Sequence, residues 1–250
     1  MESLLDRLLQ PVGRETFLKD HLGTGALHIK GSPELVRDLM SWEELSRLLS
    51  MSSIWSPFTL RVYMDRKPVP VNEYCSTALS PTQEEIQRPD SVKVQALVRR
   101  GASMVLNDID KHNPALRAMA NALREMTGGQ VQANLYFSMR QRQAFGPHFD
   151  CHDVFAVHCC GVKTWHIFEG SEDVPVRHPA LAKDDETLIR DAGRPSAIYD
   201  LRPGNLLYIP RGRYHDALAS ANGAVHVTFG VTMPKPLDLM SALWQCAVMN

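Results

Sequence analysis

From Gly129 onward the sequence is a succession of short apolar segments, and this pattern constrains the fold more than any other feature. Glycine, proline and charged residues separate the segments, so each is long enough for one strand but short for a helix. The segments are VQANLYFS, DVFAVHCC, KTWHIFEG, SAIYDL, NLLYIP, HDALAS and AVHVTFGV. Many short strands separated by turns predict an antiparallel barrel or jelly roll.

The first hundred residues are expected to form a mainly helical region that packs on this barrel. Ser41, followed three residues later by Glu44, has the spacing of a capping box and predicts a helix that continues through Leu49. An apolar stripe of leucines at residues 4–9 predicts another short helix, which ends before Pro11. The remaining predictions here are strands at 26–31, 58–64 and 101–108, a helix at 91–100 and a long loop at 72–90.

A capped helix is expected just before the barrel. Asn113 suits its N-cap, Pro114 suits its first position, and two glycines follow its predicted end near Met126. We therefore expect an α+β protein with a helical lead-in at 1–100, a jelly-roll core at 101–236 and an apolar C-terminal helix at 237–250. That last helix either packs on the barrel or forms the contact of a homodimer. The sequence leaves open whether a further domain belongs with it.

Charge and cysteine content argue against several classes of protein. The 27 basic and 28 acidic residues give a formal net charge of −1, which predicts no direct nucleic-acid partner. The five cysteines are odd in number and form no CxxC, which indicates a reducing compartment and hence a cytoplasmic protein. The N-terminus does not resemble a signal peptide, and no stretch has the ~18 uncharged apolar residues of a membrane helix. We therefore expect no membrane association.

Three residues have the types and the spacing of metal ligands. His148 and Asp150 are two residues apart, so on a strand both side chains project to the same face. This pair alone is a weak signal, because a surface hydrogen bond would explain it equally well. A second segment, GNLLYIPRGRYHDALA, places His215 after a Pro-x-Gly turn, at the start of a returning strand. Two histidines and one carboxylate form the ligand set of non-haem Fe(II) oxygenases, although zinc hydrolases use it too.

The order of several motifs resembles a known family, the JmjC-like or cupin-4 oxygenases that hydroxylate ribosomal proteins. The resemblance extends from about Gly101 to Val231 and rests on GASMVLND, NLYFS, GPHFDCHDVFAVHCCGVKTWHIF and LRPGNLLYIPRGRYHDA, in that order. DVF followed by G-x-K-x-W is its most specific part, whereas Ala219 stands where many cupins have Asn. The resemblance implies a double-stranded β-helix as the catalytic core, with Fe(II), 2-oxoglutarate and O2.

Carried over residue by residue, the resemblance implies that His148, Asp150 and His215 hold the iron and form the catalytic centre. It also implies that Lys163 binds the distal carboxylate of 2-oxoglutarate. A cation suits this role because a carboxylate pairs strongly with it in a low-dielectric site. The alternative for Lys163 is a surface lysine that flanks a turn.

Asn134 and Tyr136 lie two residues apart on the strand before the metal motif, and the resemblance implies that both contact 2-oxoglutarate. The alternative is a satisfied pair in the core. The implied reaction is hydroxylation of a side chain of a protein or peptide, with arginine or histidine of a ribosomal protein as the family's expected target. Lysine demethylation, a peptide natural-product precursor, a small metabolite and a metal cupin enzyme that does not use 2-oxoglutarate stay open as alternatives.

Other polar residues near these motifs have simpler explanations. Arginines in the two loops before the metal ligands are expected to be solvated turn residues, and the alternative is a basic entrance for an anionic substrate. The residues concerned are Arg140, Arg142, Arg211 and Arg213. Nearby histidines at 152, 158 and 166 are expected behind the ligands or at the surface, His226 either lines the pocket or packs in the core, and Cys159, Cys160 and Trp165 are expected in the barrel core.

Overall fold

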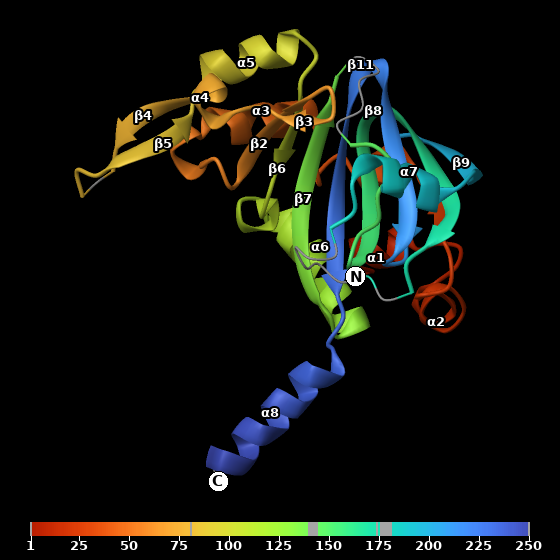
Figure 1. The fold of residues 1–250 in the computed structure, drawn as a ribbon. Coiled ribbons are helices and arrows are strands. Elements are labelled where there is room, and N and C mark those ends of the chain that lie inside the picture. The colour runs from red at the N-terminus through yellow and green to blue at the C-terminus, as the bar shows by residue number, and fades with distance from the viewer. Residues whose placement is uncertain (1, 81, 140–144, 174, 176–181, 250) are drawn as a thin grey trace.

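The computed structural model describes residues 2–80, 82–139, 145–173, 175 and 182–249, without the side chains of 221, 222 and 237. Its main sheet is antiparallel, with strand order β1-β10-β8-β11-β7-β6-β2-β3 and β9 beside β8 (Figure 1). The strands are β1 (Leu27–Ile29), β2 (Leu60–Met64), β3 (Lys67–Pro68), β4 (Cys75–Leu79), β5 (Glu85–Pro89), β6 (Ser103–Leu106), β7 (Gln130–Ser138), β8 (Asp153–Ser171), β9 (Pro195–Leu201), β10 (Leu206–Ile209) and β11 (Arg213–Thr232).

Helices occur in the N-terminal half, between β6 and β7, between β8 and β9, and at the C-terminal end, where α8 extends away from the sheet (Figure 1). The α-helices are α1 (Leu4–Leu8), α2 (Arg14–Thr16), α3 (Trp42–Ser50), α4 (Val71–Tyr74), α5 (Ser91–Arg99), α6 (Pro114–Thr127), α7 (Asp185–Ala192) and α8 (Pro236–Met249). A π-helical turn lies at Phe17–His21, and 3-10 helical turns lie at Pro33–Leu35, Ser52–Ile54 and Ile109–Lys111.

Two long strands form the centre of the sheet, and each contains two of the predicted segments. DVFAVHCC and KTWHIFEG both lie in β8, and HDALAS and AVHVTFGV both lie in β11. The two strands pair from Arg213↔Ser171 to Val231↔Asp153, with an interruption between Ala219 and Ala224. The long pairing matters for function because it places His215, near the start of β11, opposite Ile167, near the end of β8.

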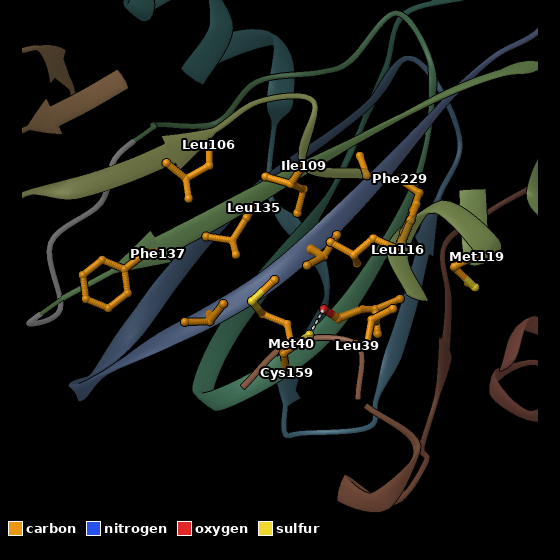
Figure 2. Packing of buried hydrophobic residues seen from close by; sticks show 14 of the residues in the cluster. Leu39, Met40, Leu106, Ile109, Leu116, Met119, Leu135, Phe137, Cys159 and Phe229 are labelled. Carbon is orange, nitrogen blue, oxygen red and sulfur yellow. Dashed lines mark hydrogen bonds between the residues drawn. The ribbon is translucent and has the colours of Figure 1, made fainter. Parts of the chain in front are cut away.

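The two faces of the sheet have different roles. Along β7, Val131, Ala133, Leu135 and Phe137 face the helical region and are buried, whereas the residues between them face the other side. Figure 2 shows this apolar layer, in which Leu135 and Phe137 lie with Leu39, Met40 and Leu116. Each fully buried leucine contributes about 2 kcal/mol of hydrophobic stabilisation. The opposite face is therefore free to carry polar residues.

The predicted helices of the N-terminal half are confirmed where a cap marked them. The Ser41 hydroxyl accepts a hydrogen bond from the backbone N–H of Glu44 at the start of α3 (3.2 Å). The Asn113 side chain accepts from the N–H of Leu116 at the start of α6 (3.0 Å). Gly128, at φ 70°, ends α6 in the left-handed region that glycine tolerates.

The prediction of a long loop at 72–90 is wrong. This segment forms α4 and then a two-stranded hairpin in which β4 pairs with β5, from Cys75↔Pro89 to Leu79↔Glu85. The hairpin lacks a clear apolar alternation because much of both its faces is exposed, so its sequence reads as polar. The lead-in also does more than pack on the barrel, since β1 pairs with β10 and joins the main sheet.

The apolar C-terminal helix α8 extends away from the rest of the protein (Figure 1). The large apolar side chains described in this helix are between 62% and 85% exposed, so these side chains do not pack on the barrel. A homodimer contact through this helix stays a prediction. Among the described residues, no helix has the length and apolar character that crossing a membrane would require.

Candidate active site

His148, Asp150 and His215 lie together at one end of the barrel, as the sequence predicts. Each offers one ligand atom, and these atoms all lie within 4.8 Å of one another. His215 Nε2 is 3.5 Å from Asp150 Oδ2, and the two imidazole centroids are 4.5 Å apart. Two histidine nitrogens and one carboxylate within this distance fit a divalent transition metal such as Fe(II).

Backbone hydrogen bonds hold the two ligand-bearing segments side by side. His148 N–H donates to the carbonyl of His215 (3.1 Å), and His215 N–H donates to the carbonyl of His148 (2.8 Å). Gly212 N–H donates to the carbonyl of Asp150 (2.8 Å). The backbone therefore brings together ligands that are 67 residues apart, with or without a metal.

Further hydrogen bonds fix the orientation of both imidazole rings. The Nδ1 atom of His148 lies 2.8 Å from the Gly146 carbonyl, and that of His215 lies 3.0 Å from the Arg213 carbonyl. A carbonyl accepts only, so Nδ1 carries the hydrogen and the Nε2 lone pair remains available to a metal. Burial, with His148 close by, lowers the pKa of His215 to about 4, which keeps this imidazole neutral at physiological pH.

The turn before His215 depends on Gly212. Its φ is +82°, and a Cβ atom there would lie 2.2 Å from the carbonyl oxygen of Glu172. Gly212→Ala is therefore expected to lower the free energy of unfolding by about 3 kcal/mol. Gly128→Ala is the matched control, because its φ is also positive but no atom lies within 4 Å, and it should cost about 1 kcal/mol. Equal losses in urea denaturation would contradict the steric explanation.

One cavity of about 190 Å³ contains this metal-ligand set and continues into the barrel. Its walls come from β6, β7, β8 and β11 and from the segment before β8. The lining residues are Ser103, Met104, Val105, Tyr136, Ser138, Phe145, His148, Asp150, His152, Val154, Lys163, Trp165, His215, Ala217, His226 and Thr228.

Lys163 lines this cavity and is 5% exposed, so it is not a surface lysine. Its ammonium group donates to the Ser138 hydroxyl (3.3 Å) and lies 5.8 Å from the centre of the Trp165 ring. Within the described residues, no carboxylate pairs with it. Burial without a counterion lowers the pKa of Lys163 to about 7. A ligand carboxylate in the cavity would supply the missing negative charge.

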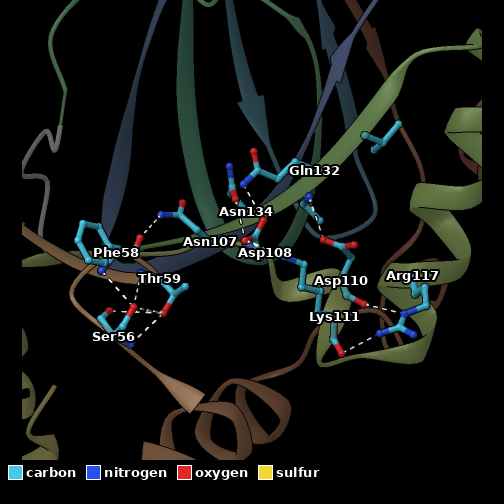
Figure 3. Close-up of polar contacts among 12 residues, drawn as sticks. Ser56, Phe58, Thr59, Asn107, Asp108, Asp110, Lys111, Arg117, Gln132 and Asn134 are labelled. Atoms are coloured by element: carbon cyan, nitrogen blue, oxygen red, sulfur yellow. Dashed lines mark hydrogen bonds and ion pairs between the residues drawn. The ribbon is translucent and has the colours of Figure 1, made fainter. Parts of the chain in front are cut away.

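Tyr136 and Asn134 are placed differently, although they share a face of β7. Tyr136 lines the metal-containing cavity, where its ring stacks on His226 with centroids 4.9 Å apart. Asn134 instead lines a neighbouring cavity, and its side-chain oxygen accepts from the N–H of Asp108 (3.2 Å). Figure 3 shows Asn134 beside Asp108 and Gln132. The predicted contact of Asn134 with 2-oxoglutarate stays a prediction, and the described cavity does not include this residue.

From the sequence alone, Ser138 was not identified, Trp165 was expected only in the barrel core, and His226 was left between pocket and core; all three line the cavity. Ser138 receives the hydrogen bond from Lys163, and Trp165 stacks on His215 with centroids 5.9 Å apart. Trp165 Nε1 and His226 Nδ1 are buried and have no hydrogen-bond partner among the described residues. Buried polar atoms without partners are uncommon, so their presence here is consistent with a site that a polar ligand completes. Trp165 lies two residues after Lys163 on the same strand, so the alternation of side chains along a strand could have identified it as a cavity residue.

The remaining histidines and arginines have the simpler roles that the sequence predicts, apart from His152, which also lines the cavity. His158 is a buried core histidine whose Nε2 lies 3.1 Å from the Gly161 carbonyl, and His166 Nδ1 lies within hydrogen-bond distance of Asp216 Oδ1 (2.7 Å). Arg213 donates to the Glu169 carbonyl (3.0 Å), and Arg211 is exposed; neither lines the cavity. Arg140 and Arg142 lie outside the described residues. Arg211 and Arg213 therefore do not line the cavity as a basic entrance would.

Comparisons with known proteins agree with this geometry. The chain is 25% identical, over 236 residues, to the Bifunctional lysine-specific demethylase and histidyl-hydroxylase NO66 of Drosophila willistoni, covering 91% of this chain and 28% of that protein. It also resembles the crystal structure of Escherichia coli ycfD, with a TM-score of 0.59, 19% identity, and 94% and 57% of the two chains covered. A structure of YcfD in complex with cobalt and 2-oxoglutarate matches with a TM-score of 0.56, 18% identity, and coverage of 94% and 55%.

These solved structures establish the cupin or jelly-roll fold expected from the sequence. The chain spans little more than half of their length and less than a third of the curated relative. A family model described as JmjC domain matches residues 108–239, which is more than half of the chain and includes the metal-ligand set and Lys163. The protein therefore belongs to the JmjC domain family.

Proposed function

We propose that this protein is an Fe(II)- and 2-oxoglutarate-dependent oxygenase that hydroxylates an amino-acid side chain of a protein or peptide. The observation that carries the proposal is the joint lining of one cavity by a His-Asp-His set and a buried lysine that has no counterion among the described residues. A metal enzyme that binds no carboxylate-bearing cosubstrate would not need a buried cation such as Lys163 in this cavity. The YcfD structure with cobalt and 2-oxoglutarate and the hydroxylase name of the NO66 relative support the same chemistry.

Each group of the cavity has a role in this proposal. His148, Asp150 and His215 would hold Fe(II), and iron in such a site supplies the oxidising chemistry that consumes O2 and 2-oxoglutarate and hydroxylates a carbon. Lys163 would pair with the distal carboxylate of 2-oxoglutarate. Ser138 accepts from Lys163, so its own O–H can donate to that carboxylate. Burial of Lys163 in the cavity, where it is 5% exposed, would strengthen this charge interaction.

The proposed target is arginine or histidine of a ribosomal protein, because a resembling structure is titled a ribosomal oxygenase and a relative is named a histidyl-hydroxylase. We keep the cytoplasm as the proposed compartment on the basis of the cysteine content. Lysine demethylation is the alternative that the same relative's name suggests.

The proposal is tested by anaerobic titration of the Fe(II)-loaded protein with 2-oxoglutarate. A saturable visible charge-transfer band is the expected result, followed by succinate release when O2 and peptides of ribosomal proteins are added. Mass spectrometry would then separate a gain of one oxygen from loss of a methyl group. Iron binding without a band and without succinate would contradict the proposal.

The affinity for 2-oxoglutarate is expected to fall as the pH rises from 7 to 9. The pKa of Lys163 is lowered to about 7 by burial, so above this pH an increasing fraction of the free protein carries a neutral amine. The carboxylate binds the cation, so affinity should decrease up to about tenfold per pH unit, with proton uptake on binding. Burial also lowers the pKa of His158 and His226, so neither titrates in this range.

Dissociation constants of the metal-loaded protein, measured by calorimetry in buffers of different ionisation enthalpy, would check this dependence. Lys163→Arg is the control, because a guanidinium remains charged throughout the range and should flatten the profile. A flat profile in the unsubstituted protein would show that Lys163 does not govern the affinity.

A further inference from the structure

The metal-ligand set has an aromatic layer directly behind it. Phe149 lies between His148 and Asp150 in the sequence, and Tyr214 precedes His215. Both rings point away from the cavity and pack together, with centroids 5.2 Å apart. They form one apolar cluster with Phe168, Ala192 and Leu188. These two rings are therefore each adjacent in the chain to metal-ligand residues and pack together behind them.

One lysine joins this layer to the rest of the fold. The Lys183 ammonium forms an ion pair with Glu172, another with Asp191 (2.8 Å), and a hydrogen bond with the Tyr214 hydroxyl (3.1 Å). It also lies 5.8 Å from the centroids of both the Phe149 and Tyr214 rings. The Tyr214 hydroxyl donates to Glu172 (2.9 Å). A single charged group thus connects the end of β8, helix α7, the start of β11 and the segment that carries His148.

We propose that Lys183 is a positioning residue for the metal site, acting through Tyr214 and Phe149 on the backbone of the three ligands. It touches none of the ligands and does not line the cavity. Glu172, just beyond β8, also donates its N–H to the Gly212 carbonyl (2.9 Å), while Gly212 N–H donates to Asp150. Backbone hydrogen bonds through Gly212 therefore give Glu172 a second connection to the ligand Asp150. The inference rests on the proposed metal-binding function.

A positioning role and a simple charge effect predict opposite results. Lys183 is a cation, so Coulomb repulsion alone predicts that its removal strengthens the binding of a divalent metal ion. Positioning predicts that its removal weakens binding, because the ligands no longer hold the geometry that the metal requires. Supporting contacts behind metal ligands typically affect affinity by about 10- to 100-fold.

The test compares Co(II) affinity and Co(II) visible absorption in the unsubstituted protein and its variants, with circular dichroism as the check on folding. Lys183→Met is expected to bind Co(II) about tenfold more weakly and to show altered d–d bands. Lys183→Arg should restore most of the affinity. Tyr214→Phe keeps the ring but removes the hydroxyl, so it should weaken binding in the same direction and provides the test if Lys183→Met does not fold.

Lys93→Met is the matched control, because Lys93 is also partly buried and donates to a backbone carbonyl, that of Cys75 (2.6 Å), far from the metal site. It should lose stability without any change in Co(II) affinity. Unchanged or tighter Co(II) binding in folded Lys183→Met, or an equal loss in Lys93→Met, would overturn the positioning role. If Lys183→Met does not fold, unchanged binding in Tyr214→Phe would overturn it. No Co(II) binding by the unsubstituted protein would overturn the proposed function as well.

Discussion

His215→Ala is expected to weaken metal binding by about 100- to 1,000-fold and to abolish the charge-transfer band with 2-oxoglutarate. His215 is 3% exposed, and its Nε2 lies 3.5 Å from Asp150 Oδ2. Alanine leaves only two ligands, and each ligand of a transition-metal site contributes several kcal/mol to binding. The backbone bonds between His148 and His215 do not involve the side chain, so the strand pairing should persist in the variant.

His28→Ala is the control for the loss of a histidine. His28 lies on β1, where its Nε2 is 3.1 Å from the Asn205 side chain and its ring contacts Tyr199. It lies outside the metal-containing cavity, so metal affinity should not change. Isothermal titration with Co(II) in the absence of oxygen measures both variants. If His215→Ala bound Co(II) as well as the unsubstituted protein, the metal would have to lie elsewhere.

Lys163→Met is expected to have two opposite effects. It should weaken 2-oxoglutarate binding by about 30- to 3,000-fold, because the carboxylate would lose the buried cation with which it is proposed to pair. It should also stabilise the ligand-free protein by about 3 kcal/mol near pH 6.5, because methionine removes a buried charge that no carboxylate neutralises. Loss of binding together with a gain in stability is the signature of a residue kept for a ligand.

The gain in stability should depend on pH in a defined direction. The pKa of Lys163 is about 7 in the folded protein and near the ordinary value of 10.5 in the unfolded chain. The unfolded state therefore binds more protons between these values, and the stability of the unsubstituted protein rises with pH across that window. The advantage of Lys163→Met should be largest below pH 7 and disappear towards pH 10.5. A variant that is less stable than the unsubstituted protein at pH 6.5 would contradict the unpaired burial of Lys163.

The sequence predicted the parts of this protein that depend on local pattern. Short apolar segments after Gly129 predicted the barrel because each strand buries one face and turn residues separate the strands. Asn113 predicted the start of α6 because a cap acts within one helical turn. His148, Asp150 and His215 were recognised together because metal ligands require particular residue types at particular spacings.

The same local reasoning did not identify features that depend on long-range contacts. The β4–β5 hairpin was read as a loop because it lies largely outside the hydrophobic core. Asn134 and Tyr136 share a strand face, yet only Tyr136 lines the cavity, since Asn134 lies two residues earlier along β7, where its side chain accepts from Asp108 N–H and lines a neighbouring cavity. Alternation assigns a residue to a face but not to a position along it.

By itself the sequence indicated the family and the barrel, because the order of motifs and the pattern of short apolar segments are present in it, and the resemblance to that family singled out the proposed metal ligands. Only the tertiary structure decided that Lys163 lies buried without a carboxylate beside the ligand set, and that Lys183 lies behind the ligands on Phe149 and Tyr214. Both depend on strands and loops far apart in the chain. Burial and charge pairing are properties of those neighbours, and a lysine in a sequence does not specify which neighbours it will have.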